Sequence, residues 1–178
     1  MPYSRLRLPL AVLLFAVALA LNACKKDEKK PAADTTDRDL SALARATTGF
    51  TWFGHDAALR PKSSGSGHGE AFLRTRYDAT AATQLDHATG RVRAGAVFGT
   101  GSLIVKELHQ TATGGISQYA VMQRNPTNPN AAPNGWVWAE FNPDGSVSLS
   151  SASKGSGCTG CHGQAGHVDA TLMNKFFP

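Results

Sequence analysis

Cysteine is scarce in this chain of 178 residues, which contains three. Three thiols cannot build the disulfide framework that stabilises many small exported domains, so a packed core must hold the fold. An excess of one charge sign is also lacking, because 18 Lys and Arg are set against 13 Asp and Glu. This mild balance does not predict binding to nucleic acid. An internal repeat is absent as well.

A long apolar run is missing too. Residues 8–21 are too short for a comfortable membrane span, but with Arg5 and Arg7 before them they have the form of a signal-peptide core. The run ends in Leu-Asn-Ala-Cys at Cys24, which resembles a bacterial lipobox and predicts lipidation of that cysteine. The alternative is an ordinary export signal with an incidental cysteine. Lys25 after it favours the outer membrane of a Gram-negative host, with the domain in the periplasm.

The composition changes twice along the chain and predicts three segments. Residues 1–23 form the signal peptide, and residues 24–38 form a lipidated cysteine followed by a polar, flexible tether that cannot bury a core. Residues 39–178 have the length of one domain. The formal net charge of +5 falls to +3 when the signal peptide is removed with its two arginines.

Near the C-terminus the chain reads Cys158-Thr159-Gly160-Cys161-His162. This is the spacing of a covalently attached c-type haem, in which two thiols bind the porphyrin and the histidine is the axial ligand of its iron. A zinc half-site would need a second Cys or His pair. A redox dithiol would need a βαβ context. We therefore expect one covalent haem c, held by Cys158, Cys161 and His162.

The hydrophobic pattern predicts an α+β fold that is predominantly antiparallel β, a single domain with short flanking helices. A helix is expected from Thr36 or Asp37 to about Ala44, a second after Asp78 to about Leu85, and a terminal helix or tail over residues 169–177. Five strands are expected, over residues 71–77, 102–109, 116–123, 136–141 and 146–150.

This strand-rich body with a C-terminal haem motif resembles the cytochrome P-460 and cytochrome c′-beta superfamily from about residue 72 to residue 177. The resemblance is carried by Arg74-x-x-Tyr77, Gly101-Ser-Leu-Ile-Val-Lys-Glu107, Tyr119-Ala-Val-Met122, Asn134-Gly-Trp-x-Trp138 and the haem motif. It implies a β-rich, often dimeric protein with an open distal side opposite the axial histidine. The P-460 branch oxidises hydroxylamine and crosslinks a lysine to the porphyrin. The c′-beta branch binds nitric oxide or carbon monoxide in an apolar pocket.

Lys106 stands out in its strand because it shares a face with Ile104 and Leu108. Lysines are seldom buried without a partner, so this position suggests a functional amine. The alternative is an edge strand from which the amine reaches water. The resemblance implies that Lys106 lies beside the haem edge and is linked to it.

Two other charged residues are candidates for the site. Glu140 shares a strand face with Trp136 and Trp138 and is a candidate distal proton carrier, or else a rim residue facing water. Arg74 is a candidate for contact with a haem propionate or the distal pocket, or else a surface charge. Tyr77 is expected in the core.

Two hypotheses for function remain. The first is an exported haem protein with an open distal side that binds or oxidises small nitrogen species, which by resemblance makes it a hydroxylamine-oxidising type of oxidoreductase. The second is an electron-transfer cytochrome with two axial ligands. The partners expected are a gaseous or nitrogen-oxide ligand, a redox partner protein, the membrane through the lipid, and a second copy of the chain. Candidates for the other axial ligand are Met122, Met173, His109 and His167.

Overall fold

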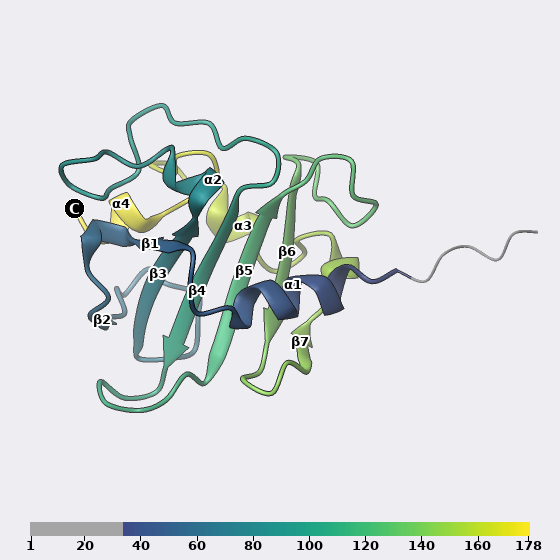
Figure 1. Cartoon of the computed structure of the whole chain (residues 1–178), viewed down its shortest axis with the longest axis horizontal. Coiled ribbons are helices and arrows are strands. Elements are labelled where there is room, and N and C mark those ends of the chain that lie inside the picture. Colours follow the sequence, from purple (N-terminus) through teal and green to yellow (C-terminus); the bar gives the residue numbers. More distant parts are fainter. Residues whose placement is uncertain (1–33) are drawn as a thin grey trace, which may run out of the picture. The chain divides into compact units, whose positions relative to one another are not determined.

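An antiparallel sheet of seven strands organises the chain in the computed structural model, which describes residues 34–178 (Figure 1). The predicted signal peptide, Cys24 and most of the tether lie outside the described residues. The strands follow the order β1-β3-β4-β5-β6-β7, and β2 pairs with β3. Their bounds are β1 Phe50–Trp52, β2 Arg60–Pro61, β3 Phe72–Asp78, β4 Leu103–His109, β5 Gln118–Arg124, β6 Trp136–Phe141 and β7 Val147–Leu149.

Helix α1 (Thr36–Arg45) covers one face of this sheet (Figure 1). Its buried residues Leu40 and Ala44 recur at helical spacing and pack over β5 and β6. This outer face contributes a cluster of apolar side chains from alternate strand positions: Leu103, Val105, Tyr119, Val121, Val137, Ala139 and Phe141. The predicted domain boundary at residue 39 therefore falls inside α1, and the helix belongs to the folded unit that begins at Asp34.

The C-terminal segment packs on the opposite, inner face. It contains η2 (Ser151–Ser153), α3 (Thr159–His162) and α4 (Met173–Phe176). A second apolar cluster forms between this segment and the inner positions of the strands, with Tyr77, Ile104, Leu108, Trp136 and Trp138 among its members. The period of two residues along each strand thus separates the two faces, as the sequence predicts.

The predicted β-rich fold is confirmed, and three details differ from the prediction. The segment 50–53, expected only to pack inward, forms β1 and the short η1 turn (Phe53–His55). Asp78 caps α2 (Ala79–Ala82) as expected, accepting from Ala81 N at 2.8 Å, but this helix ends after one turn. The terminal helix is also shorter than predicted, because Asp169 and Ala170 have left-handed backbone angles (φ 43° and 65°) that a helix cannot contain.

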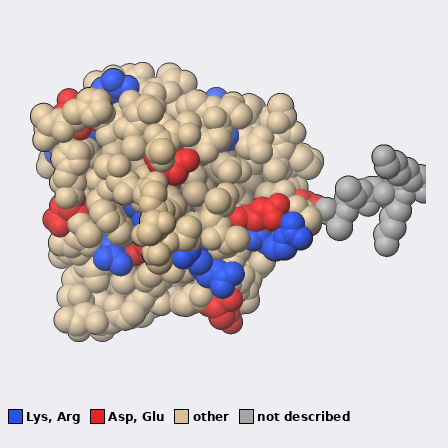
Figure 2. All heavy atoms as spheres, viewed as in Figure 1, with Lys and Arg blue, Asp and Glu red and all other residues tan. Residues whose placement is uncertain are grey.

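Basic and acidic side chains are interspersed on the face of residues 34–178 drawn in Figure 2. That face has no broad patch of one sign among the described residues. Within the same residues, no helix combines the length and apolar character that crossing a bilayer requires.

Candidate functional site

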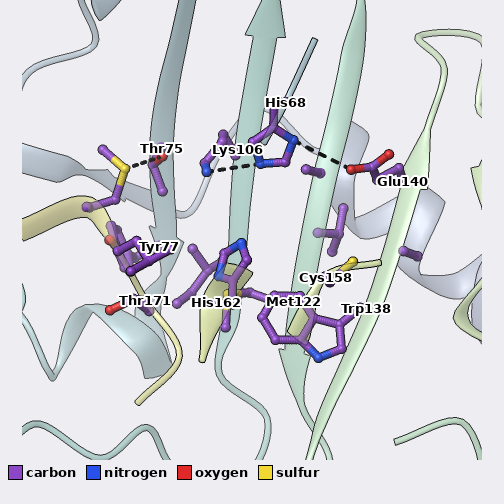
Figure 3. Close-up of a pocket in the computed structure, with 16 residues that line it drawn as sticks. His68, Thr75, Tyr77, Lys106, Met122, Trp138, Glu140, Cys158, His162 and Thr171 are labelled. Atoms are coloured by element: carbon purple, nitrogen blue, oxygen red, sulfur yellow. Dashed lines mark hydrogen bonds and ion pairs between the residues drawn. The ribbon is translucent and has the colours of Figure 1, made fainter. Parts of the chain in front are cut away.

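Two adjoining cavities lie between the inner face of the sheet and the C-terminal segment. Concave, mostly apolar sites with a few polar groups are typical of cofactor binding. The cavities have seven lining residues in common: His68, Lys106, Glu140, Cys158, His162, Leu172 and Met173. Figure 3 shows most of these side chains converging from β4, β6, the 62–70 loop and α3.

The helix α3 places the haem-motif side chains at this cavity. Its turn is closed by His162 N, which donates to Cys158 O at 3.0 Å. Residues three and four apart lie on one side of a helix, so Cys158, Cys161 and His162 face the same space. Both thiols are free. Burial raises the pKa of the Cys158 thiol to about 11, whereas redox-active dithiols have lowered values.

The imidazole of His162 is prepared to bind a metal. Its Nδ1–H donates to the carbonyl oxygen of Ala170 at 2.7 Å, which leaves Nε2 with a free lone pair. Burial, together with the positive charge of Lys106, lowers the pKa of His162 to about 4, so the ring is neutral at pH 7. The indole of Trp138 packs edge-on against it with ring centroids 4.7 Å apart.

The cavity walls fit a haem in two respects. The apolar side chains Ile104 and Met122 offer a hydrophobic surface to a porphyrin. Tyr77 also lines the cavity, and its hydroxyl group is buried without a hydrogen-bond partner. Unpaired buried donors are costly and rare, so they indicate a polar group that binds there. Within the described residues, no cluster of three or more His, Cys, Asp or Glu could hold a bare metal ion.

Lys106 occupies the inner face of β4 between Ile104 and Leu108, as predicted. Its amine lies 3.2 Å from His68 Nε2 (Figure 3). Burial lowers the pKa of Lys106 to about 8, although the charges of Cys161 and Glu140 act in the opposite direction. About a tenth of this amine is therefore unprotonated at pH 7, far more than for a lysine in water.

Glu140 also points into the cavity from β6, with 23 % of its side chain exposed. One carboxylate oxygen lies 3.6 Å from His68 Nδ1. The other accepts a hydrogen bond from Gln118 Nε2 at 3.2 Å. The carboxylate is thus placed between the cavity and the solvent.

The structure does not place Arg74 at the pocket, and that prediction is corrected. Strand β3 contributes Thr75 and Tyr77 to the cavity, and Arg74 therefore points to the outer face. There its Nε donates to Glu107 Oε2 at 2.6 Å, and its guanidinium stacks on Trp52. Arg76, only 3 % exposed in its side chain, holds the other oxygen of Glu107 at 2.9 Å.

The four candidates for a second axial ligand separate into two pairs. Met122 and Met173 line the cavity, and the Met173 sulfur accepts from Thr75 Oγ1 at 3.2 Å. The side chains of His109 and His167 do not line it. His109 points to the outer face and pairs through Nδ1 with Gly114 O, while His167 Nδ1 accepts from Ala170 N.

Two groups at the site had no signal in the sequence. His68 lies in a Gly- and Ser-rich loop without periodicity, where side-chain direction cannot be predicted. Residues 169–177 are predicted to form a terminal helix or tail, yet a bridge between Val168 and Thr171 positions the Ala170 carbonyl against His162. The sequence shows only that a histidine lies in this loop and that an aspartate precedes the turn, and neither fact places a group at the site.

Comparison with known proteins agrees with the geometry. A family model described as Cytochrome P460 matches residues 52–172, which include β3 to β7 and the haem motif. No curated protein matches the chain.

Proposed function

Since the chain belongs to the cytochrome P460 family, whose members bind haem and are related to hydroxylamine oxidation, we propose that it carries one covalent haem c and acts on small nitrogen species. Hydroxylamine and nitric oxide are the ligands we expect on the open side. One observation carries the proposal: a neutral, oriented His162 stands beside two free cysteines at a largely apolar cavity.

Each part of the chain has a defined task in this proposal. A bound haem supplies an iron that exchanges electrons and holds a small ligand. Cys158 and Cys161 anchor the group, and His162 ligates the metal through Nε2. The hydrogen bond from Nδ1 to Ala170 O fixes the ring direction and increases its basicity. Tyr77 supplies a hydroxyl donor at the wall.

Lys106 and Glu140 supply the acid and base groups of the pocket. The Lys106 amine can give or take a proton near neutral pH because burial lowers its pKa to about 8. Glu140 lies partly open to water and can exchange protons with solvent. The oxidation of hydroxylamine releases protons together with electrons, so a proton route out of the pocket suits this substrate class.

The first test concerns covalent attachment. Acid-acetone treatment of the purified protein should leave one haem per chain, and Cys161→Ala should cripple formation of the holoprotein because one thioether anchor is lost. An alanine variant of the exposed Lys154 serves as control. Haem that extracts freely from the wild type would contradict covalent attachment.

The second test separates ligand chemistry from plain electron transfer. An open distal side predicts a high-spin ferrous spectrum and rapid binding of nitric oxide or carbon monoxide. A low-spin ferrous spectrum that Met173→Leu converts to high-spin would instead show the electron-transfer alternative. Met173 is the methionine to test because it lines both cavities.

The third test concerns Lys106, which we propose lies at the haem edge and is joined to it. A joined haem gives a strongly red-shifted ferrous Soret band and a tryptic peptide that links the Lys106 strand to residues 158–162. Lys106→Arg should remove both signals and keep the thioether bonds. An ordinary haem c spectrum in the wild type would favour a gas-binding, c′-beta-like function.

We further propose that the protein is exported and anchored to the outer membrane by lipid on Cys24, with its domain in the periplasm. The sequence motif supports this. A palmitate analogue should label the wild type and not Cys24→Ser. Equal recovery of both proteins in the soluble periplasm would refute the anchor.

A further inference from the structure

Three ionisable side chains from three separate segments meet at the mouth of the cavity (Figure 3). Lys106 comes from β4, Glu140 comes from β6, and His68 reaches between them from the loop that joins β2 to β3. The distances are 3.2 Å from Lys106 Nζ to His68 Nε2 and 3.6 Å from His68 Nδ1 to Glu140 Oε1. The histidine is thus the only link recorded between the amine and the carboxylate in the described part of the chain.

The chemistry of the partners decides the direction of each contact. The Lys106 nitrogen keeps an N–H both as a free ammonium group and as an amine joined to a porphyrin carbon, so in either form it donates to the Nε2 lone pair of His68. A neutral imidazole then carries its hydrogen on Nδ1, which faces the Glu140 carboxylate. Glu140 is held in place from behind, because Gln118 Nε2 donates to Glu140 Oε2 at 3.2 Å and to Ser148 Oγ at 2.8 Å.

We propose that His68 is a positioning residue that joins Lys106 to Glu140 in one proton relay, from the pocket amine through the imidazole to the carboxylate at the surface. The proposal rests on the function proposed above. In the relay, Nε2 takes a proton from the Lys106 amine as Nδ1 gives one to Glu140. One proton enters the ring and one leaves it, so the imidazole is neutral again once it has returned to its first tautomer.

The loop that carries His68 is held in place by two contacts. Lys62 Nζ donates to the His68 carbonyl at 2.8 Å and fixes the backbone there. At the loop tip, a Cβ on Gly65 would lie 2.7 Å from the Phe176 ring of α4, so only glycine allows this close packing. The packing of the loop against α4 therefore supports the position from which His68 reaches both of its partners.

The surroundings of His68 favour a neutral ring, as the relay requires. The groups that face it are Lys106, Glu140, Glu70 of its own loop and His162. Burial is the largest influence and lowers the pKa of His68, while Glu140 and Glu70 raise it and Lys106 lowers it further. The two partners thus act on the ring with opposite signs.

Because Glu140 and Lys106 shift the pKa of His68 in opposite directions, the proposal can be tested without measuring turnover. Hydrogen–deuterium exchange at the imidazole C2 position, followed by peptide mass spectrometry on the full haem-loaded protein, reports the protonation midpoint of each histidine. Glu140→Gln should move the His68 midpoint to lower pH, because a neighbouring negative charge is removed. Lys106→Met should move it to higher pH, because a cation and donor at Nε2 is removed.

Controls and a second pair of variants complete the test. Asp144→Asn and Lys154→Met, on exposed residues outside the pocket, should leave the midpoint unchanged, and the exposed His87 should exchange alike in every variant. His68→Gln retains polar atoms near the Nε2 position but cannot relay protons. It should lower hydroxylamine turnover about 10-fold or more, with KM nearly unchanged.

The outcomes separate the two proposals. If His68 exchanges like His87, or if neither Glu140→Gln nor Lys106→Met moves its midpoint, the relay is overturned whatever the protein oxidises. If both midpoints move as expected but no nitrogen species is bound, the positioning of His68 stands and the proposed function fails. Turnover in His68→Gln equal to wild type overturns the proton-relay role.

Discussion

Replacing Asp169 tests whether hydrogen bonds to distant residues hold the turn that orients His162. The Asp169 carboxylate accepts two hydrogen bonds, from Phe98 N at 2.8 Å and from Trp136 Nε1 at 3.3 Å. Both donor residues are buried, with exposures of 1 % and 0 %. The next residue, Ala170, supplies the carbonyl that receives the His162 Nδ1–H. Asp169→Ala therefore removes the anchor and keeps His162 itself.

The expected loss of stability follows from the two N–H donors that Asp169→Ala leaves without an acceptor. Leaving a buried donor without a partner costs about 1–3 kcal/mol, so Asp169→Ala should lower the free energy of unfolding by about 2–5 kcal/mol. Asp169→Asn retains one acceptor oxygen and should lose roughly half as much. The left-handed backbone at Asp169 and Ala170 then has fewer restraints, and the carbonyl should drift from His162.

Urea unfolding followed by circular dichroism measures the first effect. The iron–histidine vibration of the ferrous protein measures the second, because a weaker Nδ1 hydrogen bond makes the imidazole a weaker ligand. Asp144→Ala is the matched control, since the Asp144 carboxylate accepts only from Ser146, within an exposed turn. A loss below about 0.5 kcal/mol in Asp169→Ala, with an unchanged vibration, would refute the anchoring role.

Three further predictions follow from burial and close packing. Gly155→Ala should destabilise the protein by about 2 kcal/mol, because φ is +77° and a Cβ there would lie 2.8 Å from Trp138; thermal unfolding reports it. Leu40→Ala should cost about 3 kcal/mol in urea unfolding and loosen α1, since Leu40 is 2 % exposed. In a variant without both haem-motif cysteines, stability should fall as pH drops from 6.5 to about 4. The pKa of His162 is about 4 and that of His68 is also below 6.5, so the unfolded chain binds more protons in that range. His162→Gln should flatten this profile.

The sequence predicts well which residues of a strand share a face, but it predicts poorly which of the two faces meets the cavity. Lys106 and Glu140 were both placed correctly among their apolar neighbours because a strand alternates strictly. The same alternation separates Arg74 from Thr75 and Tyr77, but it does not say which side meets the cavity. That choice depends on the cross-strand register, in which Arg74 lies opposite Glu107.

Loops and turns set the other limit on prediction. The direction of His68 depends on the packing of its loop against Phe176, more than 100 positions away in the sequence. The left-handed pair at Asp169 and Ala170 depends on hydrogen bonds to Phe98 and Trp136. Such contacts join segments far apart in the chain, so local propensity contains no trace of them.

The charged group on the outer face has a consequence for the fidelity of folding. Glu107 sits between Arg74 and Arg76, directly next to Lys106 along β4. A slip of β4 by one residue would exchange the two sides, so that a lysine would meet two arginines and a carboxylate would enter the apolar cavity. Like charges then repel and a charge is buried without a partner. The two arginines therefore favour the correct register of β4, because a shifted strand would lose both ion pairs with Glu107.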